Sequence, residues 1–497
     1  MGGFFGVVST SNCVPELFYG TDYHSHLGTK RGGMAVASAH NDNIVRRIHD
    51  ITNTQFRTKF DGVLNEFEGT CGIGVISDFE DQPLIVSSRL GKYAIVTVGK
   101  INNITALANR SFRSGYSHFS EMSDGELNPT EMIASLINQK TSLVEGIEYA
   151  MNSIDGSCSL LIMINGRIIA ARDKFGRTPI SIGKRNSDGA IAVTMETSAF
   201  PNLDFNHLRD LGPGEIVELL PNEVIQHKKP GNINQICSFF WVYFGYPSSN
   251  FEGINTETSR YRNGESIAAE DDYSEIDSIC GIPDSGVAHA IGYSNAAGKP
   301  YLRALVKYTP TWPRSFMPQN QAARKLVAKM KLIPVEEQIR DKRLLFCDDS
   351  VVRGTQFKDI TSRLYERGAK AIHLRSASPP IMFPCKFLNF SRSRSVLDLA
   401  ARRAVETLEG KMVEDEALLK EYTTAGTAKY NAMVDVIRKE LGLSSLKYQK
   451  LDNLIAAIGL PKEKVCTYCY DGCDHSCCAC QDVKEDAPKE ETPKAEV

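Results

Sequence analysis

The residues with the most specific chemistry lie in the second half of the 497-residue chain. Residues 343–347 end in an apolar run that predicts a buried strand, and Asp348 and Asp349 follow it directly. Carboxylates placed there accept hydrogen bonds from the vicinal hydroxyls of a sugar. The residues that follow are expected to direct backbone N–H groups and hydroxyls toward the start of a helix, and this is a favourable place to bind a phosphate monoester. These residues are Ser350, Val351, Val352, Arg353, Gly354 and Thr355.

A second loop and a cationic stretch accompany this acidic pair. Residues 283–286 could hold a pyrophosphate and its metal, because Mg²⁺ prefers oxygen ligands and phosphates. We expect Ser285, Asp348 and Asp349 to be the Mg²⁺ ligands. Residues 307–331 carry six Lys and Arg side chains, among them Lys307 and Arg314, which could close over a leaving pyrophosphate. Each element alone is ordinary, since most acidic pairs are simply solvated; their order and spacing together predict a sugar-phosphate site.

The elements that must position these residues repeat one pattern of strand, loop, helix and strand. The first unit comprises a strand at 278–282, a helix at 287–297 and a strand at 301–305; the second comprises 343–347, 356–367 and 371–375. Two such units predict a parallel sheet with right-handed crossovers, which binds ligands beyond the carboxyl ends of its strands. Residues 4–219 instead alternate β-rich runs with turns and predict an α+β layer structure. Residues 396–460 are expected to be helical.

Composition narrows the class of protein. Hydrophobic residues make up 42% and charged residues 24%, which is typical of a globular protein, and the length suggests two to four domains. The net charge of −3 makes nucleic acid a poor partner. The chain has no apolar stretch long enough for a membrane span and no signal-peptide pattern, so we expect a cytoplasmic protein without membrane contact. Six of the 13 cysteines fall within residues 466–480, which favours metal-ligating thiols over disulfides.

These motifs resemble the amidophosphoribosyltransferase family. The matching segments are residues 281–286, 314–316, 330–332, 348–355 and 378–385, with 172–176 and 212–216 in the N-terminal part. The resemblance implies an α+β N-terminal-nucleophile-type four-layer domain of the class II glutamine amidotransferase type at 1–229. It implies an α/β type I phosphoribosyltransferase domain with a parallel sheet and a helical extension at 230–460. A Cys-rich metal-binding segment at 461–480 and a disordered tail at 481–497 complete the expected organisation.

The resemblance also implies a reaction. Members of the family take 5-phosphoribosyl 1-pyrophosphate and replace its pyrophosphate with glutamine-derived ammonia, which gives 5-phosphoribosylamine, the first step of purine biosynthesis. In this chain Lys307 and Arg314 are then expected to stabilise the leaving pyrophosphate together with Mg²⁺. A homo-oligomer is expected.

Four cysteines match the positions that hold a [4Fe-4S] cluster in the iron-sulfur members of the family. They are Cys237, Cys385, Cys466 and Cys469. Four thiolates suit either [4Fe-4S] or Zn²⁺; the resemblance favours iron, and buried unligated thiols remain an alternative. Four more cysteines match nothing in the family, and a second metal site there stays open: Cys473, Cys477, Cys478 and Cys480.

The N-terminal part departs from the family where glutamine would be hydrolysed. Gly2 stands where the family has its nucleophilic cysteine, and glycine has no side-chain atom to attack with. Residues 75–77 replace the His-Val-Arg run, and residues 97–99 keep the glycine of the oxyanion hole without the asparagine. Only Arg31 and Gly32 remain of the glutamine-loop signature, and Pro129 takes the place of an acidic residue. We therefore expect that glutamine hydrolysis has been lost.

Cys13 is a poor substitute for the missing nucleophile, because it lies beyond the first strand and has no N-terminal amine beside it. Two functions remain open. The chain is either an enzyme that uses free ammonia, or ammonia from a partner protein, or it is a non-catalytic paralogue that binds phosphoribosyl pyrophosphate or a nucleotide in a regulatory or scaffolding role.

Overall fold

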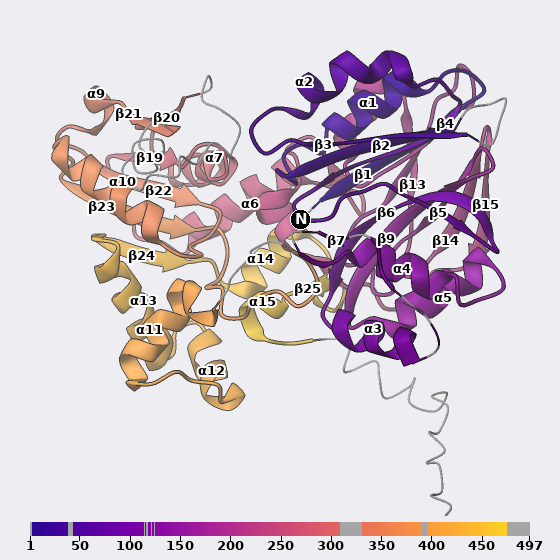
Figure 1. Ribbon diagram of the computed structural model, residues 1–497. Helices are drawn as coiled ribbons and strands as arrows, with labels where there is room; N and C mark the ends of the chain where they lie inside the picture. Colours follow the sequence, from indigo (N-terminus) through magenta and orange to yellow (C-terminus); the bar gives the residue numbers. More distant parts are fainter. Residues whose placement is uncertain are drawn as a thin grey trace, which may run out of the picture.

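The computed structural model describes residues 2–37, 43–113, 115, 118–120, 122–123, 125–308, 331–389 and 395–474. Its N-terminal half contains two antiparallel sheets that pack face to face (Figure 1). The first sheet has the order β13 (Asn206–Asp210), β11 (Ser181–Lys184), β12 (Ile191–Thr194), β1 (Gly3–Val8), β4 (Cys71–Ser77), β2 (Arg31–Ala37), β3 (Ile44–Asp50). The second has the order β15 (Glu223–Lys228), β14 (Ile216–Leu220), β10 (Arg167–Ala171), β9 (Gly156–Ile164), β6 (Gly91–Ile101), β5 (Leu84–Ser88).

Helices cover the outer faces of both sheets. Because side chains alternate along a strand, Phe4 of β1 packs between the sheets while Phe5 packs outward against α1 (Val14–Asp22) and α2 (Phe56–Phe60). The second sheet is covered by α3 (Ile104–Arg113), α4 (Pro129–Ile137) and α5 (Leu143–Ser153), through residues such as Met132 and Ile147. This half is therefore the expected four-layer structure.

The C-terminal half is built on a parallel sheet with the order β19 (Ser278–Gly281), β22 (Arg343–Asp348), β23 (Ala371–Ser376), β24 (Ser445–Tyr448). Leu345 and Cys347 of β22 face α6 (Thr256–Ala269) and α7 (Val287–Ala297). The alternate residues Leu344 and Phe346 face α10 (Thr355–Glu366), α11 (Ala400–Glu409) and α13 (Ala428–Glu440). The predicted parallel sheet and the helices at 287–297 and 356–367 are confirmed.

Two expectations about single elements were wrong. Residues 301–305 do not form the next strand: Tyr301 makes an isolated bridge to Ile279, and β20 (Leu305–Lys307) instead pairs with β21 (Leu332–Pro334). The stretch expected to be wholly helical contains α11, α12 (Glu416–Thr423), α13 and α14 (Leu451–Ile458), but also β24. Four residues between two helices carry too little periodicity to be recognised as a strand, and only pairing with β23 defines them.

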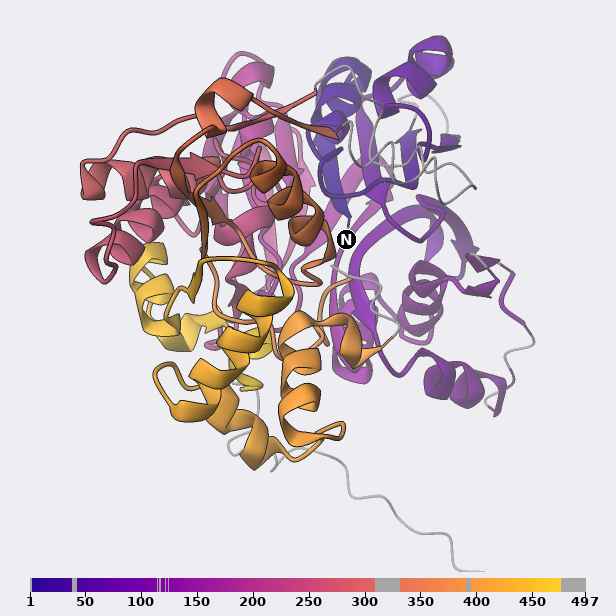
Figure 2. The ribbon, with the colours of Figure 1, turned by 90° about the vertical axis from the view of Figure 1, so that its left-hand side faces the viewer.

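The two halves meet close to the N-terminus, which lies between them in both views (Figures 1 and 2). A segment of the C-terminal half binds the paired ends of β6 and β9 in the second N-terminal sheet: Lys100 donates to the Cys385 carbonyl at 2.8 Å, and Ser157 to the Phe387 carbonyl at 2.7 Å. A short parallel pair, β16 (Ile236–Cys237) with β25 (Val465–Cys466), lies next to this segment. None of the described helices is long and apolar enough to span a bilayer.

Candidate functional site

The acidic pair lies at the carboxyl edge of the parallel sheet. Asp348 ends β22, and its Oδ1 accepts the N–H of Asp349 at 2.9 Å and the hydroxyl of Ser285 at 3.0 Å. The Ser350 hydroxyl donates to Asp349 Oδ2 at 3.2 Å. Gly354 has a φ of +76° and forms the N-cap of α10, so the loop turns sharply into the helix. The two loops predicted from the sequence are thus joined by a hydrogen bond.

Burial raises the pKa of both carboxyls, and the neighbouring charge of Asp349 raises that of Asp348 further. Two carboxylates this close resist ionising together unless a cation or hydrogen-bond donors compensate them. Raised pKa values of paired acids at the mouth of a sheet are typical of functional sites. The pair is therefore suited to bind a ligand that brings hydroxyl donors or a divalent cation.

The loop at 283–286 packs tightly on the end of β22. A side chain at Gly286 would place its Cβ 2.0 Å from the Cys347 carbonyl oxygen, so only glycine allows this approach. Lys307 Nζ contacts Asp284 Oδ2 at 2.6 Å, and both side chains are exposed. Lys307 thus lies beside the loop expected to hold pyrophosphate, while Arg314 lies outside the described residues.

A cavity of about 560 Å³ opens between the N-terminal half and Lys307. Its lining includes Tyr23, His26 and Tyr246, with the exposed ring of Tyr246 facing the hollow. Lys307 therefore borders an open cavity.

The space at Gly2 is small by comparison. Gly2 and several of the residues expected from the sequence to replace the family's glutamine-binding groups line one cavity of about 20 Å³, a volume that accommodates roughly one water molecule. Among its lining residues are Ser77, Thr97, Val98 and Gly99, so the structure brings together the departures recognised in the sequence. A Cβ at Gly2 would lie 2.5 Å from the Ile76 carbonyl oxygen. A side chain at Gly2 therefore does not fit without a shift of the backbone, and the cavity beside it is small.

Gln82 fills part of this region and was missed in the sequence. Its amide pairs with both backbone groups of Thr97, donating to the carbonyl at 3.0 Å and accepting the N–H at 2.8 Å. The Thr130 hydroxyl also donates to Gln82 Oε1, at 3.2 Å. No local signal marks Gln82, because its partners are 15 and 48 residues away in sequence. Arg31, expected from the glutamine-loop signature, is engaged by Asp50 and Asp81 at 2.6 and 2.8 Å.

Cys13 is unsuited to replace the nucleophile. Its side chain is fully buried, and burial raises the pKa of its thiol to about 12. A thiol that stays protonated at neutral pH is a poor nucleophile.

The four cysteines expected to bind a metal come together from three segments. The thiols of Cys237, Cys385, Cys466 and Cys469 are each close enough to the other three for their charges to interact. Arg177 Nη1 donates to Cys466 Sγ at 3.0 Å, and burial raises the pKa of this thiol to about 11 against the opposing effect of Arg177. Even so, the described part of the chain contains no group of three or more His, Cys, Asp or Glu side chains arranged to hold a metal ion. Cys477, Cys478 and Cys480 lie outside the described residues.

Fold and site together define a class: an amidotransferase-type four-layer domain joined to a parallel sheet of the phosphoribosyltransferase type. Residues 72–202 match the model of the glutamine amidotransferase domain. The amidophosphoribosyltransferase of Methanocaldococcus jannaschii is 30% identical over 95% of this chain and 97% of its own length. That of Bacillus subtilis is 29% identical over 95% and 93%. The chain belongs to the amidophosphoribosyltransferase family.

Two solved structures are similar to this chain over most of its length. Glutamine phosphoribosylpyrophosphate amidotransferase from B. subtilis, complexed with ADP and GMP, is 27% identical with a TM-score of 0.79, covering 95% of this chain and 96% of that one. A structure described as the allosteric regulatory enzyme of purine biosynthesis is 28% identical with a TM-score of 0.78, covering 95% of each chain. The similarity therefore extends over both halves of the molecule.

Proposed function

We propose that this chain transfers the phosphoribosyl group of 5-phosphoribosyl 1-pyrophosphate to ammonia that it does not itself release from glutamine. The observation that carries this proposal is the cavity of about 20 Å³ at Gly2, in a chain whose loop at the end of β22 keeps every group expected of a donor site. The product is 5-phosphoribosylamine. The ammonia is either free or supplied by a partner protein.

In the donor site, Asp348 and Asp349 accept hydrogen bonds from the ribose hydroxyls and so orient the sugar. The backbone N–H groups and hydroxyls of residues 350–355 bind the 5-phosphate at the N-terminus of α10, where the helix dipole favours an anion. In this reaction the C1–N bond forms as the bond from C1 to the pyrophosphate oxygen breaks. The proton lost from nitrogen passes to water. Positioning and electrostatics supply most of the catalysis.

Lys307 stabilises the negative charge of the departing pyrophosphate, with Arg314 expected to add a second cation. The hydrogen bond between Ser285 and Asp348 places three oxygen-bearing side chains, with Asp349, at one point of the sheet edge. Oxygen ligands of this kind fit Mg²⁺, which when bound would add positive charge next to the pyrophosphate. Without a cation, burial and the charge of Asp349 raise the pKa of the Asp348 carboxyl and so oppose its ionisation.

The four cysteines Cys237, Cys385, Cys466 and Cys469 are proposed to hold a [4Fe-4S] cluster, with Zn²⁺ as the alternative. In a tetrahedral zinc site all four sulfurs lie about 2.3 Å from one ion, whereas the thiolates of a [4Fe-4S] cluster bind different irons and stand further apart. The four thiols are close enough for their charges to interact, which supports a shared metal centre of either kind, and the resemblance to iron-sulfur members of the family favours the cluster. Arg177 offsets part of the negative charge that such a cluster would bring.

The second candidate is a non-catalytic paralogue that binds phosphoribosyl pyrophosphate or a nucleotide as a regulator or scaffold. The loss of groups around Gly2 favours it over a glutamine-dependent enzyme. Calorimetry with phosphoribosyl pyrophosphate and Mg²⁺, followed by a pyrophosphate-release assay with ammonium, separates the two. We expect both binding and ammonium-dependent release. Binding without release would support the paralogue, and the absence of binding would contradict both.

A further inference from the structure

Three buried polar side chains form one hydrogen-bonded network at the carboxyl edge of the parallel sheet. They are Asn263 of α6, His289 of α7 and Gln449, which follows β24. Their exposed fractions are 1%, 1% and 3%. Buried amide and imidazole groups need hydrogen-bond partners, so the contacts of this network constrain the elements that carry the partners.

Asn263 joins the ends of two strands of this sheet. Its Nδ2 donates to the carbonyl of Ala377, just after β23, at 2.7 Å, and its Oδ1 accepts Nε2 of Gln449 at 2.6 Å. Backbone groups fix both amide orientations, because a carbonyl only accepts and an N–H only donates. For Gln449 this backbone group is the N–H of Lys450, which donates to its Oε1 at 2.9 Å. Asn263 therefore holds the first residues beyond β23 and β24.

Ala377 is in turn hydrogen-bonded to the strand that ends in Asp348. The N–H of Ala377 donates to the Asp348 carbonyl at 2.8 Å, and the Asp348 side chain accepts the Ser285 hydroxyl at 3.0 Å. The side chain of Asn263 is thus two hydrogen bonds away from Asp348. A shift of Ala377 moves the backbone from which the Asp348 carboxylate extends.

His289 connects Asn263 to the second loop of the donor site, at 283–286. It lies in the first turn of α7, which begins directly after this loop. Its Nε2 donates to the Val242 carbonyl at 3.2 Å, and its Nδ1 accepts Nδ2 of Asn263 at 3.4 Å. The Val242 carbonyl fixes this tautomer, because it can only accept. Burial lowers the pKa of His289 to about 3, so the ring is neutral and both contacts persist at pH 7.

The helices α6 and α7 pack backbone to backbone beside these side chains. A Cβ at Gly264 would lie 1.9 Å from the His289 carbonyl oxygen, and a Cβ at Gly292 would lie 2.1 Å from the Tyr261 carbonyl oxygen. Glycine at both positions allows this approach. Because close-packed interiors transmit displacements, a shift of Asn263 on α6 also moves the start of α7.

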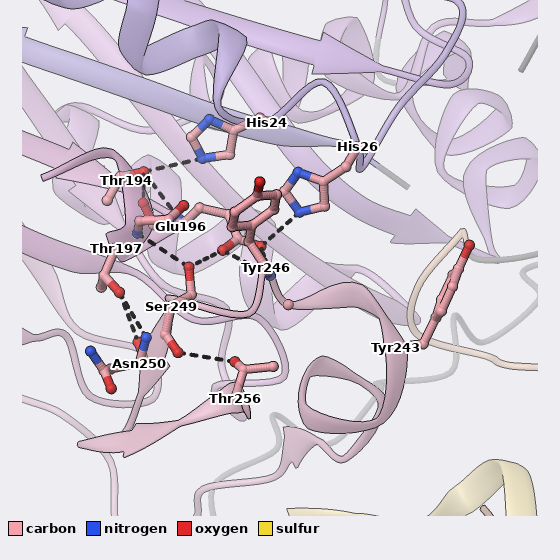
Figure 3. Close-up of polar contacts among 12 residues, drawn as sticks. His24, His26, Thr194, Glu196, Thr197, Tyr243, Tyr246, Ser249, Asn250 and Thr256 are labelled. Atoms are coloured by element: carbon pink, nitrogen blue, oxygen red, sulfur yellow. Dashed lines mark hydrogen bonds and ion pairs between the residues drawn. The ribbon is translucent and has the colours of Figure 1, made fainter. Parts of the chain in front are cut away.

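The Val242 carbonyl belongs to a segment that is fixed to the N-terminal half. This connecting strip runs from the π-helix η4 (Phe240–Phe244) to Ser249. Glu196, just after β12, is fully buried, and its two oxygens accept the backbone N–H of Tyr246 at 3.3 and 3.4 Å (Figure 3). The same carboxylate accepts the Ser249 hydroxyl. The network is therefore hydrogen-bonded to the N-terminal half as well as to the parallel sheet.

Arg260 binds the connecting strip to α6, the helix that carries Asn263. Its guanidinium donates at 2.8, 3.0 and 2.8 Å to the carbonyls of Trp241, Tyr243 and Gly245. These residues flank Val242, so the carbonyl that His289 contacts is held in a fixed place.

We propose that Asn263 and His289 are positioning residues of the phosphoribosyl site. Asn263 holds the end of β23 next to Asp348, and His289 holds the start of α7, from which the loop at 283–286 extends. Neither residue belongs to the two loops, and both act by fixing them relative to each other and to the connecting strip. This inference rests on the function proposed above, because it assigns a role to residues around the same site.

A matched control for Asn263 exists in the N-terminal domain. Asn128, the N-cap of α4, is also 1% exposed. Its Nδ2 donates to the Asp81 carbonyl at 3.1 Å, and its Oδ1 accepts the N–H of Thr130 at 2.8 Å. Asn128→Leu and Asn263→Leu therefore remove equivalent buried amides, but only the second is joined to the donor site.

A second control lies on α7 itself. Ser294 is 8% exposed, and its hydroxyl donates at 2.6 Å to the Lys299 carbonyl, beyond the C-terminal end of the helix. Ser294→Ala therefore weakens the packing of the same helix away from the loop at 283–286.

The test compares wild-type protein with Asn263→Leu, His289→Leu, His289→Gln and the two controls in the full chain. Calorimetry gives the Kd of phosphoribosyl pyrophosphate with Mg²⁺, ammonium-dependent pyrophosphate release gives kcat and KM, and thermal unfolding measures stability. We expect Asn263→Leu and His289→Leu to raise Kd and KM about tenfold, a typical size for coupling through such a network. His289→Gln keeps an amide donor for the Val242 carbonyl and should lose less affinity than His289→Leu.

Asn128→Leu and Ser294→Ala should lower the unfolding midpoint without raising Kd. Equal Kd values for wild type and Asn263→Leu, or an equal rise in either control, would overturn the positioning role while leaving the proposed function standing. Wild-type protein that binds no phosphoribosyl pyrophosphate would contradict the proposed function, and the positioning role with it.

Discussion

Residue 2 is a glycine without a side chain, and the structure leaves little space around it for one. Replacement of a nucleophile by glycine is, in the sequence, a single change that one reverse substitution could repair. In the structure, a Cβ at this position would lie 2.5 Å from the Ile76 carbonyl oxygen, and the adjoining cavity measures about 20 Å³. The residue and its surroundings therefore argue together for a lost glutaminase.

Gly2→Cys should accordingly release no glutamate from glutamine, because the added thiol has neither room nor a glutamine pocket beside it. We also expect a loss of stability of about 1–3 kcal/mol from overpacking. Glutamate release and urea unfolding check the two parts. Glutamate formation by Gly2→Cys above the wild-type level would show that the pocket is still present.

The Asp348 carboxylate is expected to lower the stability of the ligand-free protein as the pH rises, while it contributes to ligand binding. The pKa of this carboxyl is raised in the folded chain, so its protonated form stabilises the fold at pH values below the unfolded-state pKa of about 3.9, and this contribution is lost as the pH rises through the folded-state pKa. Asp348→Asn carries no charge at any pH. Without Mg²⁺ and ligand, the variant should therefore gain stability relative to wild type as the pH rises from 4 toward 8.

Ammonium-dependent activity of Asp348→Asn should fall about 10²-fold, because the sugar is no longer oriented. Thermal unfolding across this pH range and pyrophosphate release measure the two effects. A difference in unfolding midpoint that stays constant with pH would contradict the raised pKa.

In the turn from β22 into α10, the backbone conformation and the close packing favour glycine at position 354. Gly354 has a φ of +76°, and a Cβ there would lie 2.9 Å from Leu441 Cδ2. Gly354→Ala combines backbone strain with this contact and should cost about 1–3 kcal/mol of stability while weakening phosphoribosyl pyrophosphate binding. Denaturant unfolding and calorimetry check both effects.

Gly410 provides the control for this substitution. It has a similar φ of +69° at the end of α11 but nothing within 4 Å of its Cβ position. Gly410→Ala should show the strain alone and leave ligand binding unchanged. Equal affinity of wild type and Gly354→Ala would mean that the loop at 350–355 does not bind the phosphate.

The helices and strands around the donor loop could be predicted because each of them has a clear periodicity and a glycine-bearing turn. The parallel sheet and the edge at which Asp348 lies follow from the repeated strand, loop and helix pattern, although residues 301–305 of the first unit do not join the sheet as a strand. The strand β24 and the lone bridge of Tyr301 could not be predicted, since long-range pairing defines them. The same holds for Gln82, Glu196 and Arg260, whose contacts join segments distant in sequence.

Across the whole molecule, the cysteines and the N-terminal sheets are linked. Cys385 lies in the segment that binds β6 through Lys100, while Cys237 and Cys466 pair in β16 and β25. Anaerobically purified protein should contain about four irons and four sulfides per chain. Removing the cluster with a chelator should lower the unfolding midpoint, because the metal holds these segments together. Zinc without sulfide would contradict the cluster.

The proposed function is also tested at this scale, because the proposed donor site lies in one half of the molecule and the amidotransferase-type domain in the other. The most direct test measures pyrophosphate release from phosphoribosyl pyrophosphate and Mg²⁺ with ammonium in one reaction and glutamine in another. A phosphoribosyltransferase without a working glutaminase should release pyrophosphate with ammonium and form neither pyrophosphate nor glutamate with glutamine. Pyrophosphate release driven by glutamine, with matching glutamate formation, would contradict this account.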